Sequence, residues 1–141
     1  MSTGRRITPT RTLIVTGKLH SLNEYLGACN THNKAGGRMK WEDQTKVEWF
    51  VRSQLRGVRI KNPVIMRYHW FEPNMRRDLD NISSYGRKVI QDALVHCGVI
   101  HNDGWRQVVG FSDNFYIDRK EPRIEVEIVE CQPEKGGRKW N

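Results

Sequence analysis

The chain has 141 residues, of which 37% are hydrophobic and 28% are charged, as is typical of one soluble globular domain. No apolar run approaches the ~20 residues that a membrane span needs, and the first residues lack the apolar region of a signal peptide. We therefore expect a cytoplasmic protein without membrane contact, folded as a single domain over residues 1–141 around a core at about 12–130.

The formal net charge is +8, and both ends of the chain contribute to it. Residues 1–11 hold three arginines and no acidic residue, while residues 132–141 hold three basic residues and one glutamate. Basic ends fit a polyanion partner such as nucleic acid, and they equally fit two solvated, flexible tails.

Sequence motifs for common cofactors are missing. The chain has neither the glycine-rich phosphate-binding loop nor the dinucleotide fingerprint. Cys29 and His32 have zinc-ligand spacing, but no second pair completes a tetrahedral site. A calcium loop starting at Asp78 would need glycine and glutamate where Ser83 and Val89 stand. We expect no organic cofactor.

Hydrophobic periodicity and turn residues predict the secondary structure in chain order. The elements are a strand at 11–19, a mobile polar loop at 30–40, a helix at 41–57, a strand at 62–73, a helix at 81–98, and strands at 105–119 and 123–130. The order β-α-β-α-β-β predicts an α+β domain with a mixed or mainly antiparallel sheet and two helices.

The stretch RRDLDNISS places Asp78 and Asp80 where a strand gives way to a helix. In extended backbone the two carboxylates would share one face, ~7 Å apart, and would repel unless a cation lay between them. Mg²⁺ accepts such oxygen ligands and keeps positions for water and phosphate. Asp103, in the next loop, is a third candidate ligand. The structural alternative is that Asp80 or Asn81 caps the helix, which is worth ~1 kcal/mol, and that NDG around Asp103 is a turn.

Cationic side chains flank these acids. Arg76 and Arg77 precede them, and Arg87 and Lys88 follow in the helix. Near a metal-bound phosphate, such cations stabilise the charge that develops in the transition state. Alternatively, the first pair neutralises nearby acids and the second pair lies on a solvated helix face.

Three segments together resemble the RusA family of Holliday junction resolvases, which are often encoded by phages. They are RRDLDN at 76–81, QDAL at 91–94 and CGVIHNDGWRQVV at 97–109. The family pattern is Asp-x-Asp-Asn, a helix with a lysine and Asp-Ala-Leu, a glycine, and an acidic pair before a strand. The resemblance covers about residues 12–130, and the combination of motifs is specific.

The first part of the chain adds a further match. Ser21, Asn23 and Tyr25 keep the spacing of the family's Ser-x-Asn-x-Tyr motif, without its usual prolines. The resemblance implies a RusA-like fold and a homodimer that acts on branched DNA in a bacterial host's cytosol with Mg²⁺, for which Mn²⁺ could substitute. By this resemblance Asp78, Asp80 and Asp103 would be catalytic and hold the metal; the residues that would contact DNA are Arg76, Arg77, Arg87, Lys88 and Asn23.

Two positions depart from the family pattern. The acidic pair is Asn102-Asp103 here, so one carboxylate is missing. The family's lysine would fall on Ser84 when counted from Asp80, but on Lys88 when counted back from the Asp-Ala-Leu motif. The difference of four residues is close to one helical turn. We infer an extra turn or a longer loop before the helix, and take Lys88 as the catalytic lysine with Arg87 as the alternative.

Two functions follow from these patterns. The first is a magnesium-dependent endodeoxyribonuclease that resolves Holliday junctions or other branched DNA by paired phosphodiester hydrolysis. The second is a basic protein that binds DNA at junctions or forks without cutting it. Binding under the second hypothesis would fall steeply with salt and be indifferent to loss of the carboxylates.

Overall fold

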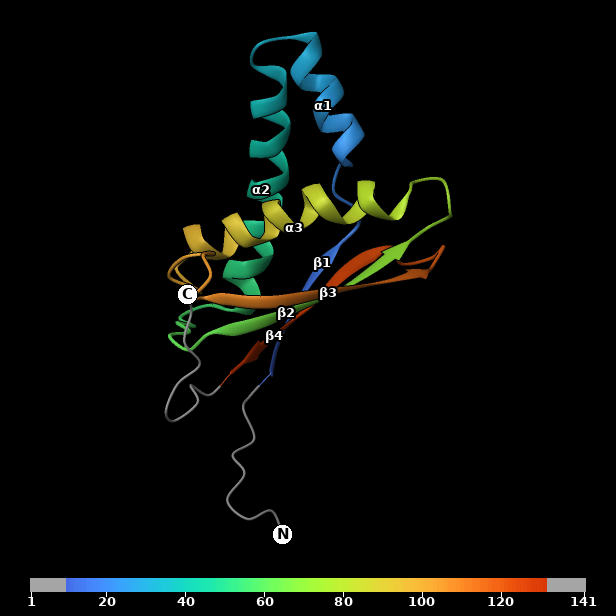
Figure 1. The fold of residues 1–141 in the computed structure, drawn as a ribbon. Coiled ribbons are helices and arrows are strands. Elements are labelled where there is room, and N and C mark those ends of the chain that lie inside the picture. Colours follow the sequence, from blue (N-terminus) through green and yellow to red (C-terminus); the bar gives the residue numbers. More distant parts are fainter. Residues whose placement is uncertain (1–9, 132–141) are drawn as a thin grey trace, which may run out of the picture.

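The computed structural model describes residues 10–131, which form a four-stranded sheet with three helices on one of its faces (Figure 1). In chain order the elements are β1 (Thr10–Thr16), α1 (Leu22–Thr31), α2 (Ala35–Gln54), β2 (Val64–Glu72), α3 (Leu79–His96), β3 (Val108–Ile117) and β4 (Arg123–Glu130). The basic tails predicted from the sequence lie almost entirely outside this range.

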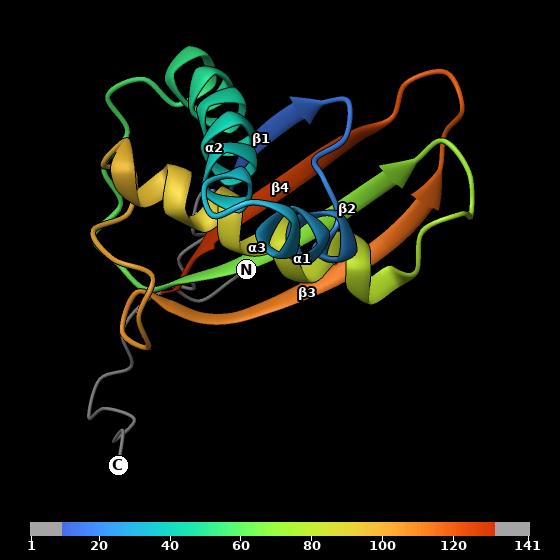
Figure 2. The same cartoon turned by 90° about the horizontal axis from the view of Figure 1, so that it is seen from above.

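The sheet is mixed, with strand order β1-β4-β2-β3. β4 pairs antiparallel with both β1 and β2, whereas β2 and β3 are parallel. The carboxyl ends of β2 and β3 therefore meet at one edge of the sheet, and the chain leaves β2 there to begin α3 (Figure 2). Asp78 and Asp80 lie at this end of the sheet, where β2 gives way to α3.

The core forms between the sheet and α3. Alternate residues of β2 are fully buried, namely Val64, Met66, Tyr68 and Trp70, because successive side chains of a strand point to opposite faces. The buried face of α3 repeats at helical spacing through Ile82, Val89, Ile90, Ala93 and Leu94. A Cβ atom at Gly86 would lie 2.7 Å from the Trp70 ring, so glycine here allows α3 to lie close on the sheet.

Residues 21–54 form a helical hairpin that rises away from the sheet (Figure 1). Ser21 and Glu24 start α1 as a capping box, in which each side chain bonds the other residue's backbone amide at 3.1 and 2.9 Å. α2 then approaches so closely that a Cβ at Gly36 would lie 2.2 Å from the Cys29 sulfur.

The predicted α+β class and mixed sheet are confirmed. The loop predicted at 30–40 is wrong for most of its length, because α1 ends at Thr31 and α2 already begins at Ala35. Gly36 serves close packing of α2 against α1 rather than a turn. The order is thus β-α-α-β-α-β-β, one helix more than the sequence pattern predicts.

Candidate functional site

Asp78 and Asp80 flank the first helical residue of α3, Leu79. Asp78 occupies the N-cap position with an extended backbone (φ −69°, ψ 151°), but its side chain makes no capping hydrogen bond. The prediction that Asp80 or Asn81 is the cap is therefore wrong, and so is the assumption that extended backbone continues as far as Asp80. Within residues 10–131 neither carboxylate has a hydrogen-bond or ion-pair partner, and both residues are exposed.

The position of these acids suits ionised carboxylates. The amino end of a helix carries partial positive charge from its unpaired backbone N–H groups, which favours anions there. The same feature favours a phosphate group. The start of α3 can therefore hold two carboxylates and attract a phosphodiester, provided that a cation offsets the repulsion between them.

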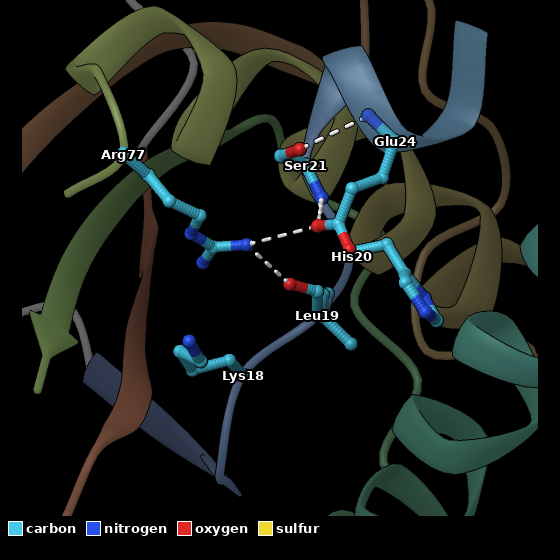
Figure 3. A pocket seen from close by; sticks show the side chains of 6 residues that line it. All are labelled: Lys18, Leu19, His20, Ser21, Glu24 and Arg77. Carbon is cyan, nitrogen blue, oxygen red and sulfur yellow. Dashed lines mark hydrogen bonds and ion pairs between the residues drawn. The ribbon is translucent and has the colours of Figure 1, made fainter. Parts of the chain in front are cut away.

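The two neighbouring arginines have different environments. Arg77 donates from Nε and Nη2 to the Glu72 carboxylate at 3.1 and 2.8 Å, and from Nη1 to the Leu19 carbonyl at 2.8 Å. Nη1 also lies 3.7 Å from Glu24 (Figure 3). Arg76 is exposed, and its side chain has no partner in the described part of the chain. Arg77 thus joins α1, β2 and the loop before α3, while Arg76 keeps its donors available.

Arg77 also lines a solvent-facing pocket of about 460 Å³ (Figure 3). The pocket's other residues are Lys18, Leu19, His20, Ser21 and Glu24. The His20 ring turns away from Arg77 in this view and bonds the buried Asp43 through Nδ1 at 2.9 Å. Asn23, predicted to contact DNA, is exposed in the first turn of α1 beside this pocket.

Lys88 lies two turns further along α3 than Asp80, a rise of about 12 Å. Its Nζ binds Asp103 Oδ2 at 3.0 Å and Asp92 Oδ1 at 3.1 Å. The hydrogen bond to Asp103 and then that to Asp92 raise the pKa of Lys88 above its ordinary value. Ser84, one turn before Lys88, donates instead to the Asp80 carbonyl at 2.6 Å. Because α3 is continuous from Leu79, Ser84 and Lys88 lie one turn apart within the helix, and no longer loop precedes Lys88 after Asp80.

The three predicted acids do not form one cluster. No group of three potential metal-binding acids, histidines or cysteines occurs among residues 10–131. Asp103 sits over the middle of α3, held by Lys88, whereas Asp78 and Asp80 lie at its start. The arrangement therefore consists of an exposed acid pair and, along the same helix, a third acid neutralised by a lysine.

Comparison with known families identifies the chain's relatives. A family model described as endodeoxyribonuclease RusA matches residues 5–129. The chain belongs to the RusA family. Membership indicates an endodeoxyribonuclease of Holliday junctions, which agrees with the resemblance seen in the sequence. No curated protein matches the chain. Among the described helices, none is both long and apolar enough to cross a membrane.

Asp78 and Asp80 are the residues of this RusA-family chain that could hold a magnesium ion. Mg²⁺ is usually held by one or two carboxylates, with waters and substrate phosphates filling the other positions. Asp78 and Asp80 supply two hard oxygen donors that no described residue engages. Glu72 is close in sequence, but its carboxylate is already taken by Arg77. The site can therefore take a metal whose remaining ligands come from solvent and DNA.

A further acid, Asp113 on β3, is not among the residues predicted from the sequence. Its carboxylate accepts a hydrogen bond from the Trp70 indole at 2.9 Å and forms an ion pair with Arg87. The Arg87 guanidinium also lies over the Phe111 ring. Arg87, predicted to contact DNA, is thus engaged by β3. The alternation of β3 could have shown which face Asp113 takes, but its partner Arg87 comes from a contact that only the folded chain creates.

A second pocket, of about 400 Å³, opens beside Asp78 where β2 and β3 end and α3 begins. Its lining residues are Glu72, Asn74, Met75, Arg77, Asp78, Leu79, Ile82, Phe115, Tyr116 and Ile117. Asp78 is common to this pocket and the acid pair, so a ligand in the pocket and a phosphate at the acids would be neighbours.

Proposed function

We propose that this RusA-family chain is a magnesium-dependent endonuclease that cuts branched DNA, the four-way junction above all, by paired phosphodiester hydrolysis. The observation that carries the proposal is the pair Asp78 and Asp80, which are exposed at the positive end of α3 and have no side-chain partner among residues 10–131. Two neighbouring carboxylates repel each other, and a bound cation would offset that repulsion while leaving room for a phosphate.

The residues have distinct roles in this proposal. Asp78 and Asp80 hold the ion, and Asp103 joins them if the loop after α3 moves. When bound, the metal lowers the pKa of a coordinated water and polarises the phosphoryl oxygen. Arg76 binds the adjacent backbone, whereas Arg77 positions the loop that carries the acids.

Lys88 stabilises charge on the phosphoryl oxygens only after its ammonium leaves Asp92 and Asp103 for the DNA phosphate. The Lys88 ammonium then has anionic partners both before and after the exchange, first the two aspartates and then the phosphate. Lys88 therefore stays protonated throughout. The raised pKa of Lys88 keeps the group charged before the DNA arrives.

Cutting both strands symmetrically requires two sites related by a twofold axis, which a homodimer supplies. We propose that dimer for this chain, with Mn²⁺ able to replace Mg²⁺ because both accept carboxylate and water ligands. Sedimentation at micromolar concentration tests the oligomeric state directly.

The decisive experiment compares wild type with Asp80→Asn on a synthetic four-way junction, with and without Mg²⁺. We expect metal-dependent cutting by wild type and a cleavage rate at least about 100-fold lower in Asp80→Asn. Binding should persist or tighten, because removal of a negative charge reduces repulsion from phosphate. Glu42→Gln, an exposed acid on α2, is the matched control and should cut normally.

One observation favours a non-cutting DNA-binding protein as the second candidate. Lys88 is neutralised by two acids, and Asp103 is held apart from the acid pair. Under that function, both wild type and Asp80→Asn would bind the junction with the same steep salt dependence and neither would cut it. This result would overturn the enzymatic proposal.

A further inference from the structure

The pocket beside Asp78 has a rim of large apolar side chains exposed to solvent. Met75 is 87% exposed, Leu79 56% and Ile117 46%. They come from three different segments: the loop before α3, its first turn and the last residue of β3. Their convergence at one opening is a property of the fold rather than of one sequence run.

These rim residues do little for the core. None belongs to the buried cluster that joins the sheet to the helices. Exposed apolar side chains are common singly, but a group of them around a concave site marks a contact surface. The rim is therefore expected to serve a ligand rather than stability.

The walls of the pocket are held by contacts within the protein. Ile82 of α3 is buried, and Phe115 of β3 packs against the core cluster, so both are fixed parts of the pocket's lining. The paired Glu72 and Arg77 close another side. Because these groups already have partners, the pocket presents fixed apolar walls and few unsatisfied charges apart from Asp78.

The place of Asp78 defines what can occupy the pocket. If the acid pair holds the metal and the scissile phosphate, the neighbouring nucleoside must lie within a few ångströms of Asp78. A nucleobase has flat faces that pack on aromatic and aliphatic side chains. Its polar edge can bond the Asn74 amide at the same pocket.

We propose that this pocket takes an unstacked nucleobase next to the scissile phosphate. The inference rests on the proposed nuclease function and adds the part of the substrate that the site recognises. In a continuous duplex, unstacking a base costs a few kcal/mol, and it costs least where pairing is already interrupted. The pocket thereby favours DNA at a branch point over regular duplex.

The test is a cycle of two changes, one in the protein and one in the DNA. The protein variant is the double substitution Met75→Ala with Leu79→Ala. The DNA is a four-way junction with an abasic site in place of each branch-point nucleotide in turn. Leu26→Ala is the matched protein control, because Leu26 is 47% exposed on α1 and lines neither pocket.

We expect wild type to bind one abasic junction about 10-fold more weakly than the intact junction, as loss of one stacked base implies. The double variant should bind the intact junction about 10-fold more weakly and lose the distinction between the two DNAs. Replacing Met75 by leucine instead of alanine should restore part of the lost affinity for the intact junction. Anisotropy in Ca²⁺ gives these affinities without cleavage, so the result is readable even if no junction is cut.

Two outcomes would overturn the inference. In the first, the double variant keeps the full difference in affinity between intact and abasic junctions. In the second, the double variant binds both junctions equally weakly and its dimer dissociates in sedimentation, which would mean that the rim contacts a second copy of the chain. Neither outcome would contradict the proposed role of Asp78 and Asp80. Failure of wild type to cut any junction would instead contradict the proposed function.

Discussion

The charged residues at the two ends of α3 differ in whether they have side-chain partners. At its amino end, Asp78 and Asp80 are exposed and have no partner among residues 10–131. From its middle onward, the side chains are paired instead: Lys88 with Asp92 and Asp103, Asp92 with Lys40, and His96 with Glu48.

This difference separates binding chemistry from structural support. The ion pairs along the second half connect α3 to α2 and to the loop after α3, so they satisfy their charges within the fold. The acids at the amino end gain only the favourable potential of the helix terminus. Their remaining coordination capacity is directed to solvent, where a cation and a phosphate can use it.

The largest expected effect concerns the arginine that supports the amino end. Arg77→Ala removes the partner of Glu72, whose side chain is buried, and should lower the free energy of unfolding by about 3–5 kcal/mol. Urea denaturation measures it. The adjacent Arg76→Ala is the matched control, and should change stability by less than about 0.5 kcal/mol while weakening binding to junction DNA. Equal, small stability losses in both variants would show that Arg77 does not support the loop.

Lys88 tests whether the paired half of α3 also takes part in catalysis. Lys88→Ala should slow junction cleavage about 100-fold, or roughly 2.7 kcal/mol in the barrier. Its effect on stability should stay below about 1 kcal/mol, since the side chain is more than half exposed. The measurement is single-turnover cleavage beside urea denaturation.

The helical turn between Ser84 and Lys88 makes a rescue possible. Ser84→Lys places a lysine one turn after Asp80, where the family pattern has it, and should recover part of the activity lost in Lys88→Ala. Normal cutting by Lys88→Ala would remove Lys88 from the mechanism. Loss of cutting without rescue would place the required charge at the position of Lys88 itself, beside Asp103.

Local patterns predicted the parts of this protein that depend on local interactions. Alternation located β2 and β4, and the apolar stripe through Ile82, Val89 and Ile90 located α3. The acidic motif located Asp78 and Asp80 at the strand-to-helix junction. Each of these depends on spacing along the chain, which the sequence displays directly.

Contacts between distant segments could not be read in the same way. For Arg77 the sequence predicts either a DNA contact or neutralisation of nearby acids, and the structure shows the second through its pairing with Glu72. Asp103 looked like a partner of the acid pair, but the sheet order brings it to Lys88 instead. The hairpin of α1 and α2 was hidden because Gly36 suggested a loop, although the capping box at Ser21 and Glu24 was a helix signal in the sequence.

The smallest expected effect lies at the carboxyl end of α3, where His96 pairs with the buried Glu48 of α2. Burial raises the pKa of Glu48, but hydrogen bonds from Gln44 and His96 and the charges of His96 and Arg52 outweigh it. The pKa of this carboxyl therefore lies below its ordinary value of 4.5. A lowered folded-state pKa means that the ionised group stabilises the protein above pH 4.5, and that this contribution is lost as the pH falls through the folded value.

Glu48→Gln should accordingly cost about 1 kcal/mol near neutral pH and progressively less below pH 4.5, where protonated glutamic acid and glutamine make similar neutral contacts. Urea unfolding of both proteins from pH 7 to pH 3 gives the difference at each pH, with the exposed Glu42→Gln as the control on the same helix. A difference that stays constant over this range would mean that Glu48 contributes through packing alone. A difference that shrinks would show that ionised contacts hold the paired half of α3, in contrast to Asp78 and Asp80, which have no such contact among residues 10–131.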